Sequence, residues 1–152
     1  MLLEFLPCVY AFLACAGFCV LYNIHAAGIF FCSLGGALGW LVYLLTADAT
    51  GGNDMVQSLL ASLAISTYAE VMARVRKYPT TSYVIIGILP LVPGAGIYYT
   101  MEYAVAGETE LFLSSFLHTL GLAGSMALGI LLVGSVVRLI TAGRRRRLER
   151  KE

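Results

Sequence analysis

Five apolar stretches, each about as long as a membrane is thick, constrain this sequence more than any other feature. A hydrocarbon core of about 30 Å requires roughly 20 helical residues at a rise of about 1.5 Å each. The windows that meet this requirement are residues 2–22, 28–47, 55–73, 80–101 and 111–142. The chain is 59% hydrophobic and 12% charged, whereas soluble domains are about 45–50% apolar and about 25% charged. The sequence therefore predicts an all-α membrane protein with five transmembrane helices.

The segments between these windows are short and contain helix breakers or polar residues, and no long linker or tandem repeat is present. We therefore expect one transmembrane domain, residues 1–143, followed by a basic tail, residues 144–152. The first window lacks the basic segment that precedes the apolar region of a signal peptide. It is predicted to be a transmembrane helix rather than a cleaved signal.

All ten Lys and Arg residues lie in two clusters, and the clusters predict the orientation. The first is Arg74, Arg76 and Lys77, and the second runs from Arg138 into the tail. Basic residues favour the cytoplasmic side, and two windows separate the clusters, so both are predicted to be cytoplasmic, with the N-terminus outside the cell (inner or plasma) membrane. The fourth window must then cross, because a re-entrant segment would leave the tail outside. The tail is predicted to anchor the chain at anionic lipid rather than to bind nucleic acid.

The chemistry-bearing residues do not assemble into a catalytic or metal-binding motif. Cys8, Cys15, Cys19 and Cys32 lie inside predicted spans without a CxxC pair, and no His or acid is placed to complete a metal shell. They are interpreted as small buried residues, with no disulfide, metal or cofactor. No Walker loop, HExxH or GxSxG motif is present, so an enzyme is not expected.

Small residues recur four positions apart in three of the windows, which predicts close helix packing, either within the chain or against a partner. These residues are Gly35 and Gly39, Ser62 and Ser66, and Gly121, Ser125 and Gly129.

Two ionisable residues inside the windows have both a structural and a functional interpretation. Glu70 precedes Arg74 by four residues, which favours a helix salt bridge, but an intramembrane carboxylate also suggests a proton-binding or substrate-facing group. His118, next to Thr119, is either a histidine hydrogen-bonded between helices or a candidate proton relay.

The fourth window contains the segment "GILPLVPGAG" at residues 87–96. Pro90 and Pro93 each remove one helical hydrogen bond, and Gly94 permits unusual backbone angles. The window should divide into two half-helices whose freed groups need partners in the membrane. Broken helices of transporters place such groups at a solute or an ion, and the N-terminus of the second half would suit a carboxylate. The alternative is a kink stabilised by packing alone.

The stretch "AEVMARVRKYPTTSYVIIGILPLVPGAGIYY" resembles the small-subunit type of the threonine/serine exporter family. Glu70, Arg74, Pro79, Pro90, Pro93, Gly94 and Tyr98 follow the family pattern in order. Asn23 and "SLGGALG" also resemble the family, but the basic residues that relatives often carry after Asn23 are absent.

The resemblance implies a secondary, proton-coupled exporter of threonine, serine or dicarboxylates such as succinate. It also implies that this chain is half of a split transporter, whose partner is a larger membrane subunit of the same family. The solute site is then expected at Pro90, Pro93 and Gly94 with Tyr98 nearby, and Glu70 as the proton or gating carboxylate. The alternatives are a non-transporting scaffold subunit and a homo-oligomeric channel.

Overall fold

The computed structural model describes residues 5–25 and 27–149, with side chains as far as residue 143, and the described residues contain helices and no strands. The side chains of the predicted basic tail therefore lie outside the described part. The predicted all-α fold is confirmed. The elements are α1 (Leu6–Leu21), α2 (Ala27–Ala47), α3 (Asp54–Arg76), α4 (Thr80–Ile88), the 3-10 helix η2 (Leu89–Leu91), α5 (Gly94–Ala106) and α6 (Thr109–Glu149).

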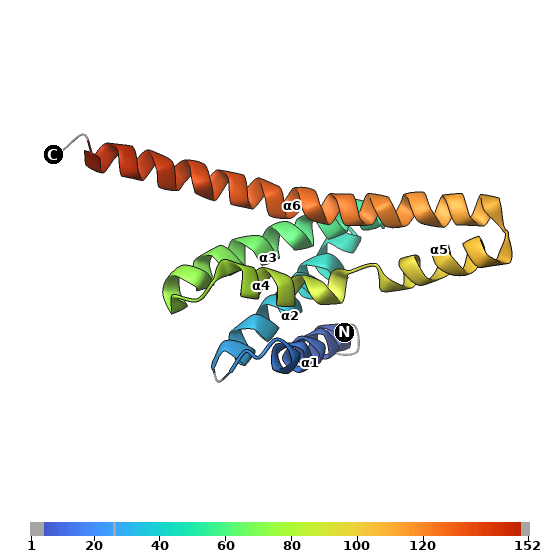
Figure 1. Cartoon of the computed structure of the whole chain (residues 1–152), viewed down its shortest axis with the longest axis horizontal. Helices are drawn as coiled ribbons and strands as arrows, with labels where there is room; N and C mark the ends of the chain where they lie inside the picture. The colour runs from blue at the N-terminus through green and yellow to red at the C-terminus, as the bar shows by residue number, and fades with distance from the viewer. Residues whose placement is uncertain (1–4, 26, 150–152) are drawn as a thin grey trace.

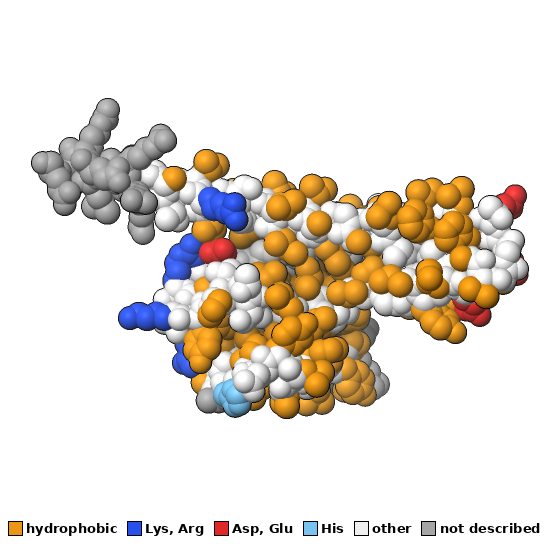
Figure 2. Space-filling view, viewed as in Figure 1, with side chains coloured by type: hydrophobic (Ala, Val, Ile, Leu, Met, Phe, Trp, Pro, Cys, Tyr) orange, Lys and Arg blue, Asp and Glu red, His pale blue; other side chains and the backbone are white. Residues whose placement is uncertain are grey.

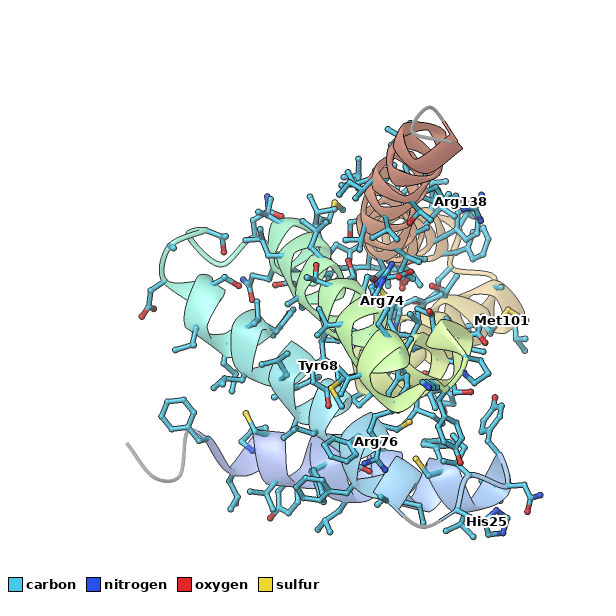
Figure 3. All side chains as sticks on the ribbon, turned by 90° about the vertical axis from the view of Figure 1, so that its left-hand side faces the viewer. His25, Tyr68, Arg74, Arg76, Met101 and Arg138 are labelled. Carbon is cyan, nitrogen blue, oxygen red and sulfur yellow. The ribbon has the colours of Figure 1, made fainter. Side chains whose placement is uncertain are left out.

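Three helices of the described chain are long and apolar enough to cross a membrane: α2, α3 and the Thr109–Gly143 part of α6. The segments Thr80–Leu91 and Gly94–Ala106 form a fourth candidate, bent by 57°. The helix α1 has 16 residues, fewer than the roughly 20 that a perpendicular crossing requires, and Figures 1 and 3 show it lying across the long axis of the molecule. The described residues thus contain three candidate spans, or four if the bent pair counts as one span. The predicted first span, at α1, is not among them.

The helices α2, α3 and α4 pack against one another, α1 covers α2, and α6 lies along α3. The helix α5 packs chiefly against α6, and these two extend together beyond the other helices (Figure 1). The segments α4 and α5 run in the same general direction in Figure 1, so the bent pair does not return to the side from which it started.

Charge divides the molecule into two ends. Figure 2 shows Lys and Arg side chains gathered at one end and acidic side chains at the tip of the α5–α6 hairpin. One acidic side chain lies among the basic ones in this view. The bent pair therefore runs from the basic end, where the last turn of α3 carries Arg74 and Arg76, to the acidic tip of the α5–α6 hairpin.

The small-residue faces predicted from the sequence pack inside this chain. A Cβ atom on Gly35 would lie 3.1 Å from the Tyr68 ring of α3, and one on Gly121 would overlap the side chain of Met55. A Cβ atom on Gly129 would overlap Ser62 and lie 3.1 Å from the Leu59 carbonyl oxygen. These glycines therefore set the close approach of α2 and α6 to α3.

The buried core joins α1, α2, α3 and α4. Cys15, Cys19 and Cys32 are buried there against Tyr83 and Ile86, whereas Cys8 is half-buried. All four thiols are free, as expected for cysteines used as small buried side chains. In the described part of the chain, no three His, Cys, Asp or Glu residues are grouped closely enough to hold a metal ion.

Candidate functional site

The predicted break in the fourth window is present and begins at Pro90. The helix α4 ends at Ile88, one 3-10 turn follows, and α5 begins at Gly94. A proline has no amide hydrogen and fixes φ near −65°, so Pro90 and Pro93 together prevent a continuous helix. The result is the bend of 57° between the two halves.

Both carbonyl groups that the prolines free have partners within the chain. Pro90 leaves the buried Ile86 carbonyl oxygen without its helical donor, and the Sγ atom of Cys15 donates to this oxygen over 3.2 Å. Pro93 does the same to the Leu89 carbonyl, which accepts from the amide of Val92 over 3.3 Å. A solute at this break must therefore be bound by other groups.

A cavity of about 450 Å³, which we call the break cavity, lies beside the break. Pro93 and Ile97 line it from the broken span, and Thr119 and Ile130 line it from α6. Most of its lining is apolar, but the Oγ1 atom of Thr119 is buried and has no hydrogen-bond partner among the described residues. Buried hydroxyl groups are nearly always hydrogen-bonded, so this atom marks a place for a polar partner.

The first turn of α5 borders the break cavity and is only partly satisfied. The amide of Gly94 donates to the Val92 carbonyl over 2.7 Å, and the amide of Ile97 donates to the Pro93 carbonyl over 3.0 Å. In the described structure the amides of Ala95 and Gly96 have no such partner, and no side chain caps the helix. A helix N-terminus with free amides favours an anion.

Two hydroxyl groups join α5 to α6 next to this cavity. The Oγ1 atom of Thr100 donates to the Gly96 carbonyl over 2.7 Å and lies 2.8 Å from the Oγ atom of Ser115. This contact holds α5 against α6, and residues of both helices line the break cavity.

Three of the four residues predicted to form the site at the break, Pro90, Gly94 and Tyr98, do not line the break cavity. Tyr98 is 65% exposed and packs edge-on against Tyr99, with ring centroids 5.4 Å apart. Pro90 lines a separate cavity of about 320 Å³ with Tyr10 and Trp40. Of the predicted cluster, Pro93 alone lines the break cavity, and Gly94 is exposed beside it.

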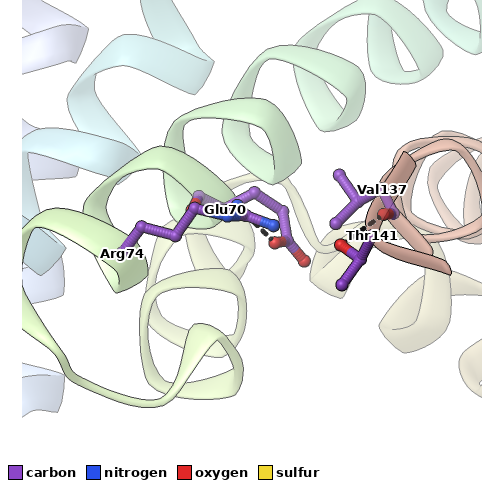
Figure 4. Close-up of polar contacts among 4 residues, drawn as sticks. All are labelled: Glu70, Arg74, Val137 and Thr141. Carbon is purple, nitrogen blue, oxygen red and sulfur yellow. Dashed lines mark hydrogen bonds and ion pairs between the residues drawn. The ribbon is translucent and has the colours of Figure 1, made fainter. Parts of the chain in front are cut away.

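Glu70 forms the salt bridge that its spacing to Arg74 predicts. The Nη1 atom of Arg74 lies 2.9 Å from the Oε2 atom of Glu70. Figure 4 shows the carboxylate turned from α3 toward α6, where Val137 and Thr141 lie. The Glu70 side chain is 21% exposed and that of Arg74 is 56% exposed, so the carboxylate is the more enclosed partner.

The Glu70 carboxylate also lines a second cavity, of about 350 Å³, between α3, α4 and α6. We call it the Glu70 cavity. Its polar lining comes from Ser66 and Glu70 on α3, Thr80 and Thr81 on α4, and Arg138 on α6. Sequence reasoning missed Arg138 as a site residue and interpreted it as part of the topology signal. A signal was available, because Arg138 is the one Lys or Arg residue inside the window 111–142.

One side chain belongs to both cavities. Ile130 of α6 lines the break cavity and the Glu70 cavity. The two cavities are therefore neighbours along α6, with an isoleucine at their boundary. Of the predicted site residues, Pro93 lines the break cavity and Glu70 lines the Glu70 cavity, and the linings of both cavities are mostly apolar. Neither cavity is lined by the other four, Pro90, Gly94, Tyr98 and His118.

His118 lies apart from both cavities. Its Nε2 atom is 3.9 Å from the Oδ2 atom of Asp54, the first residue of α3, and both side chains are about half exposed. The pair connects α6 to α3 near the start of α3.

The sequence model of the family described as "Threonine/Serine exporter, ThrE" matches residues 7–136. This range includes the broken span and both cavities except for Arg138. No curated protein sequence and no solved structure gave a significant match.

Proposed function

This chain belongs to the threonine/serine exporter family, and on that premise we propose that it is a membrane subunit of a secondary, proton-coupled exporter. Its solutes are threonine and serine, or dicarboxylates such as succinate. The observation that carries the proposal is that the matched range contains a broken span with a cavity at its break. Transporter folds bind solutes at such broken helices.

In this proposal the break cavity holds the solute part-way across the membrane. Pro90, Pro93 and Gly94 shape the break, and the free amides of Ala95 and Gly96, next to the lining residues Pro93 and Ile97, would bind the solute carboxylate at the edge of the cavity. The unpartnered hydroxyl of Thr119 is a second polar contact. Tyr98 lies on the exposed face of α5, where it would contribute to the site from the side of a partner subunit.

A partner fits the shape of the molecule. The α5–α6 hairpin extends beyond the other helices and exposes large apolar side chains, among them Met101 and Val105. We propose that a larger membrane subunit of the same family packs here and completes the second half of an inverted repeat. A second copy of this chain is the homo-oligomeric alternative.

The topology we propose has five crossings in the cell (inner or plasma) membrane, with α1 as the first. The basic end is cytoplasmic and the acidic end is outside, in accordance with the distribution of Lys and Arg. The N-terminus is then outside and the C-terminus inside.

Two titratable sites lie at opposite ends of α3 and suit a proton-driven exporter. His118 and Asp54 lie near its first residue, at the proposed outer side, and Glu70 lies near its last turn. We assign His118 as the relay that receives protons from outside, and Glu70 as the carboxylate that takes them up near the cytoplasm.

The proposal is tested by efflux of labelled threonine, serine and succinate from cells with and without this chain, each carrying the larger subunit. Deletion of the chain should slow the efflux of at least one solute. Unchanged efflux of all three would refute the proposal. A variant with Pro90→Ala and Pro93→Ala, present in the membrane at the normal level, should also lose efflux, whereas a scaffold subunit would tolerate both changes.

A further inference from the structure

The Glu70 cavity brings both signs of charge and three hydroxyl-bearing residues together in one partly open cavity, whose remaining lining is apolar. Its volume of about 350 Å³ lies within the range of about 300–1,000 Å³ typical of small-molecule sites. Glu70 and Arg138 come from different helices, α3 and α6. The cavity therefore depends on the folded packing of these helices and is more than a local feature of one of them.

One wall of this cavity suits a carboxylate. Arg138 lines it, and among the described residues its guanidinium group has no ion pair. Thr80 and Thr81, the first two residues of α4, line it beside Arg138. The N-cap of α4 is Pro79, which provides no side-chain cap. A free guanidinium group and an uncapped helix N-terminus both favour an anion.

Glu70 provides the negative charge that a ligand's ammonium group requires. Arg74 contacts its Oε2 atom, and no hydrogen bond within the described structure reaches its Oε1 atom. An ionised carboxylate has about four acceptor positions. Glu70 can therefore accept hydrogen bonds from an ammonium group while it keeps its bond to Arg74.

Ser66 adds an observation that is independent of the charges. It is 3% exposed and lines the cavity, and its Oγ atom is buried without a hydrogen-bond partner in the described part of the chain. A buried hydroxyl without a partner is rare and costs free energy. A ligand with its own hydroxyl group would satisfy it.

From this arrangement we infer that the Glu70 cavity binds a zwitterionic α-amino acid with a side-chain hydroxyl, such as serine or threonine, at the cytoplasmic mouth of the exporter. The ligand's carboxylate lies at Arg138 and the start of α4, its ammonium group at Glu70 and its hydroxyl at Ser66. This inference rests on the proposed function and identifies an entry site distinct from the break cavity. Ile130 then lies at the boundary between this entry site and the break cavity.

The same geometry discriminates against dicarboxylates. A second carboxylate at the position of the ammonium group would face Glu70, and two like charges at close range repel each other. Glu70→Gln should therefore weaken the binding of serine and relieve the repulsion of succinate.

The test is equilibrium binding of labelled L-serine to de-energised membrane vesicles that carry the full-length chain and its larger partner, with vesicles lacking the chain as background. Threonine should displace the label, whereas ethanolamine, which has no carboxylate, and 3-hydroxypropionate, which has no ammonium group, should not. Glu70→Gln and Arg138→Gln should each weaken serine binding by about tenfold or more, because each leaves a charged group of the ligand unpaired. Arg138→Lys should retain part of the serine binding, and Ser66→Ala should remove the preference for serine over alanine.

Matched controls separate the cavity from general charge effects and from misfolding. Lys77→Gln removes a basic charge near the same end of α3, and Glu102→Gln removes a carboxylate on α5; neither residue lines the cavity. Both variants should bind serine normally. Equal loss of serine binding in Lys77→Gln would overturn the site. Unchanged serine binding in Glu70→Gln and Arg138→Gln, present at normal membrane levels, would also overturn it. If efflux persists in these two variants while serine binding is unchanged, the exporter function stands without this site. Cavity-dependent binding with no efflux of any solute would support the site and refute the proposed function.

Discussion

At the scale of single residues, the break in the fourth window depends on a thiol from another helix. The sulfur of Cys15 donates to the Ile86 carbonyl that Pro90 leaves free, and Ile86 is buried. The four cysteines therefore include one with a specific structural task, which is to satisfy a proline-freed carbonyl.

We predict that Cys15→Ala destabilises the protein by roughly 1–3 kcal/mol, the cost of leaving a buried acceptor unsatisfied. Cys15→Ser, which keeps a donor, should cost less. In a Pro90→Ala background the new amide at position 90 can replace the thiol, so Cys15→Ala should cost less there than in the native chain. Thermal unfolding in nanodiscs measures the four combinations, and an equal cost in both backgrounds would contradict the assignment.

This residue pair also marks a limit of sequence analysis. The loss of the helical bonds was predictable from Pro90 and Pro93, because it follows from local geometry. The partner was not, because Cys15 lies 71 residues from Ile86 and only the packing of α1 brings them together. The Glu70–Arg74 pair was predictable for the opposite reason, since its spacing lies within one helix turn.

At the scale of helices, α6 packs on α3 through small residues. Their spacing in the sequence predicted a contact face on α6, but not the helix that this face contacts. Gly129 lies against Ser62 and the Leu59 carbonyl, so the spacing of four indicates packing within the chain. A pattern of small residues gives the contacting face of a helix, but it does not state which helix the face meets. For the same reason, Arg138 could not be placed beside Glu70 before the register of α6 on α3 was known.

Gly129→Ala should weaken this packing. The added methyl group would overlap Ser62 and press on backbone, and overpacking of this kind costs about 1–3 kcal/mol. Gly124→Ala is the matched control on the same helix, because a Cβ atom there has no neighbour within 4 Å; it should stabilise α6 by about 0.5–1 kcal/mol through helix propensity. Thermal unfolding of both variants in nanodiscs makes the comparison, and similar shifts for the two would count against the α3–α6 contact.

At the scale of the whole molecule, the bent pair, the charge distribution and the two cavities support the solute path that we propose. The basic end holds the Glu70 cavity, the break cavity follows along α6, and Ile130 lines both. In the proposed topology a solute enters from the cytoplasm at the charged cavity and then reaches the break.

The first helix provides a sharp test of this topology. Five crossings place the N-terminus outside, whereas four crossings without α1 place it in the cytoplasm while leaving the C-terminus there. We predict that a cysteine added before Met1 reacts with a membrane-impermeant thiol reagent in intact cells, and that one added after Glu152 reacts only after lysis. Labelling of the N-terminal cysteine only after lysis would reduce the number of crossings to four.

The central claim, that this chain is required for the transport of hydroxyl-bearing amino acids, is tested most directly by reconstitution. Proteoliposomes containing the purified chain and its larger partner are loaded with labelled L-serine or L-threonine, and efflux is measured with and without an imposed proton gradient. We predict rapid efflux that the gradient accelerates and that falls to background when the chain is omitted. Efflux at the same rate from vesicles that contain the larger subunit alone would contradict the account.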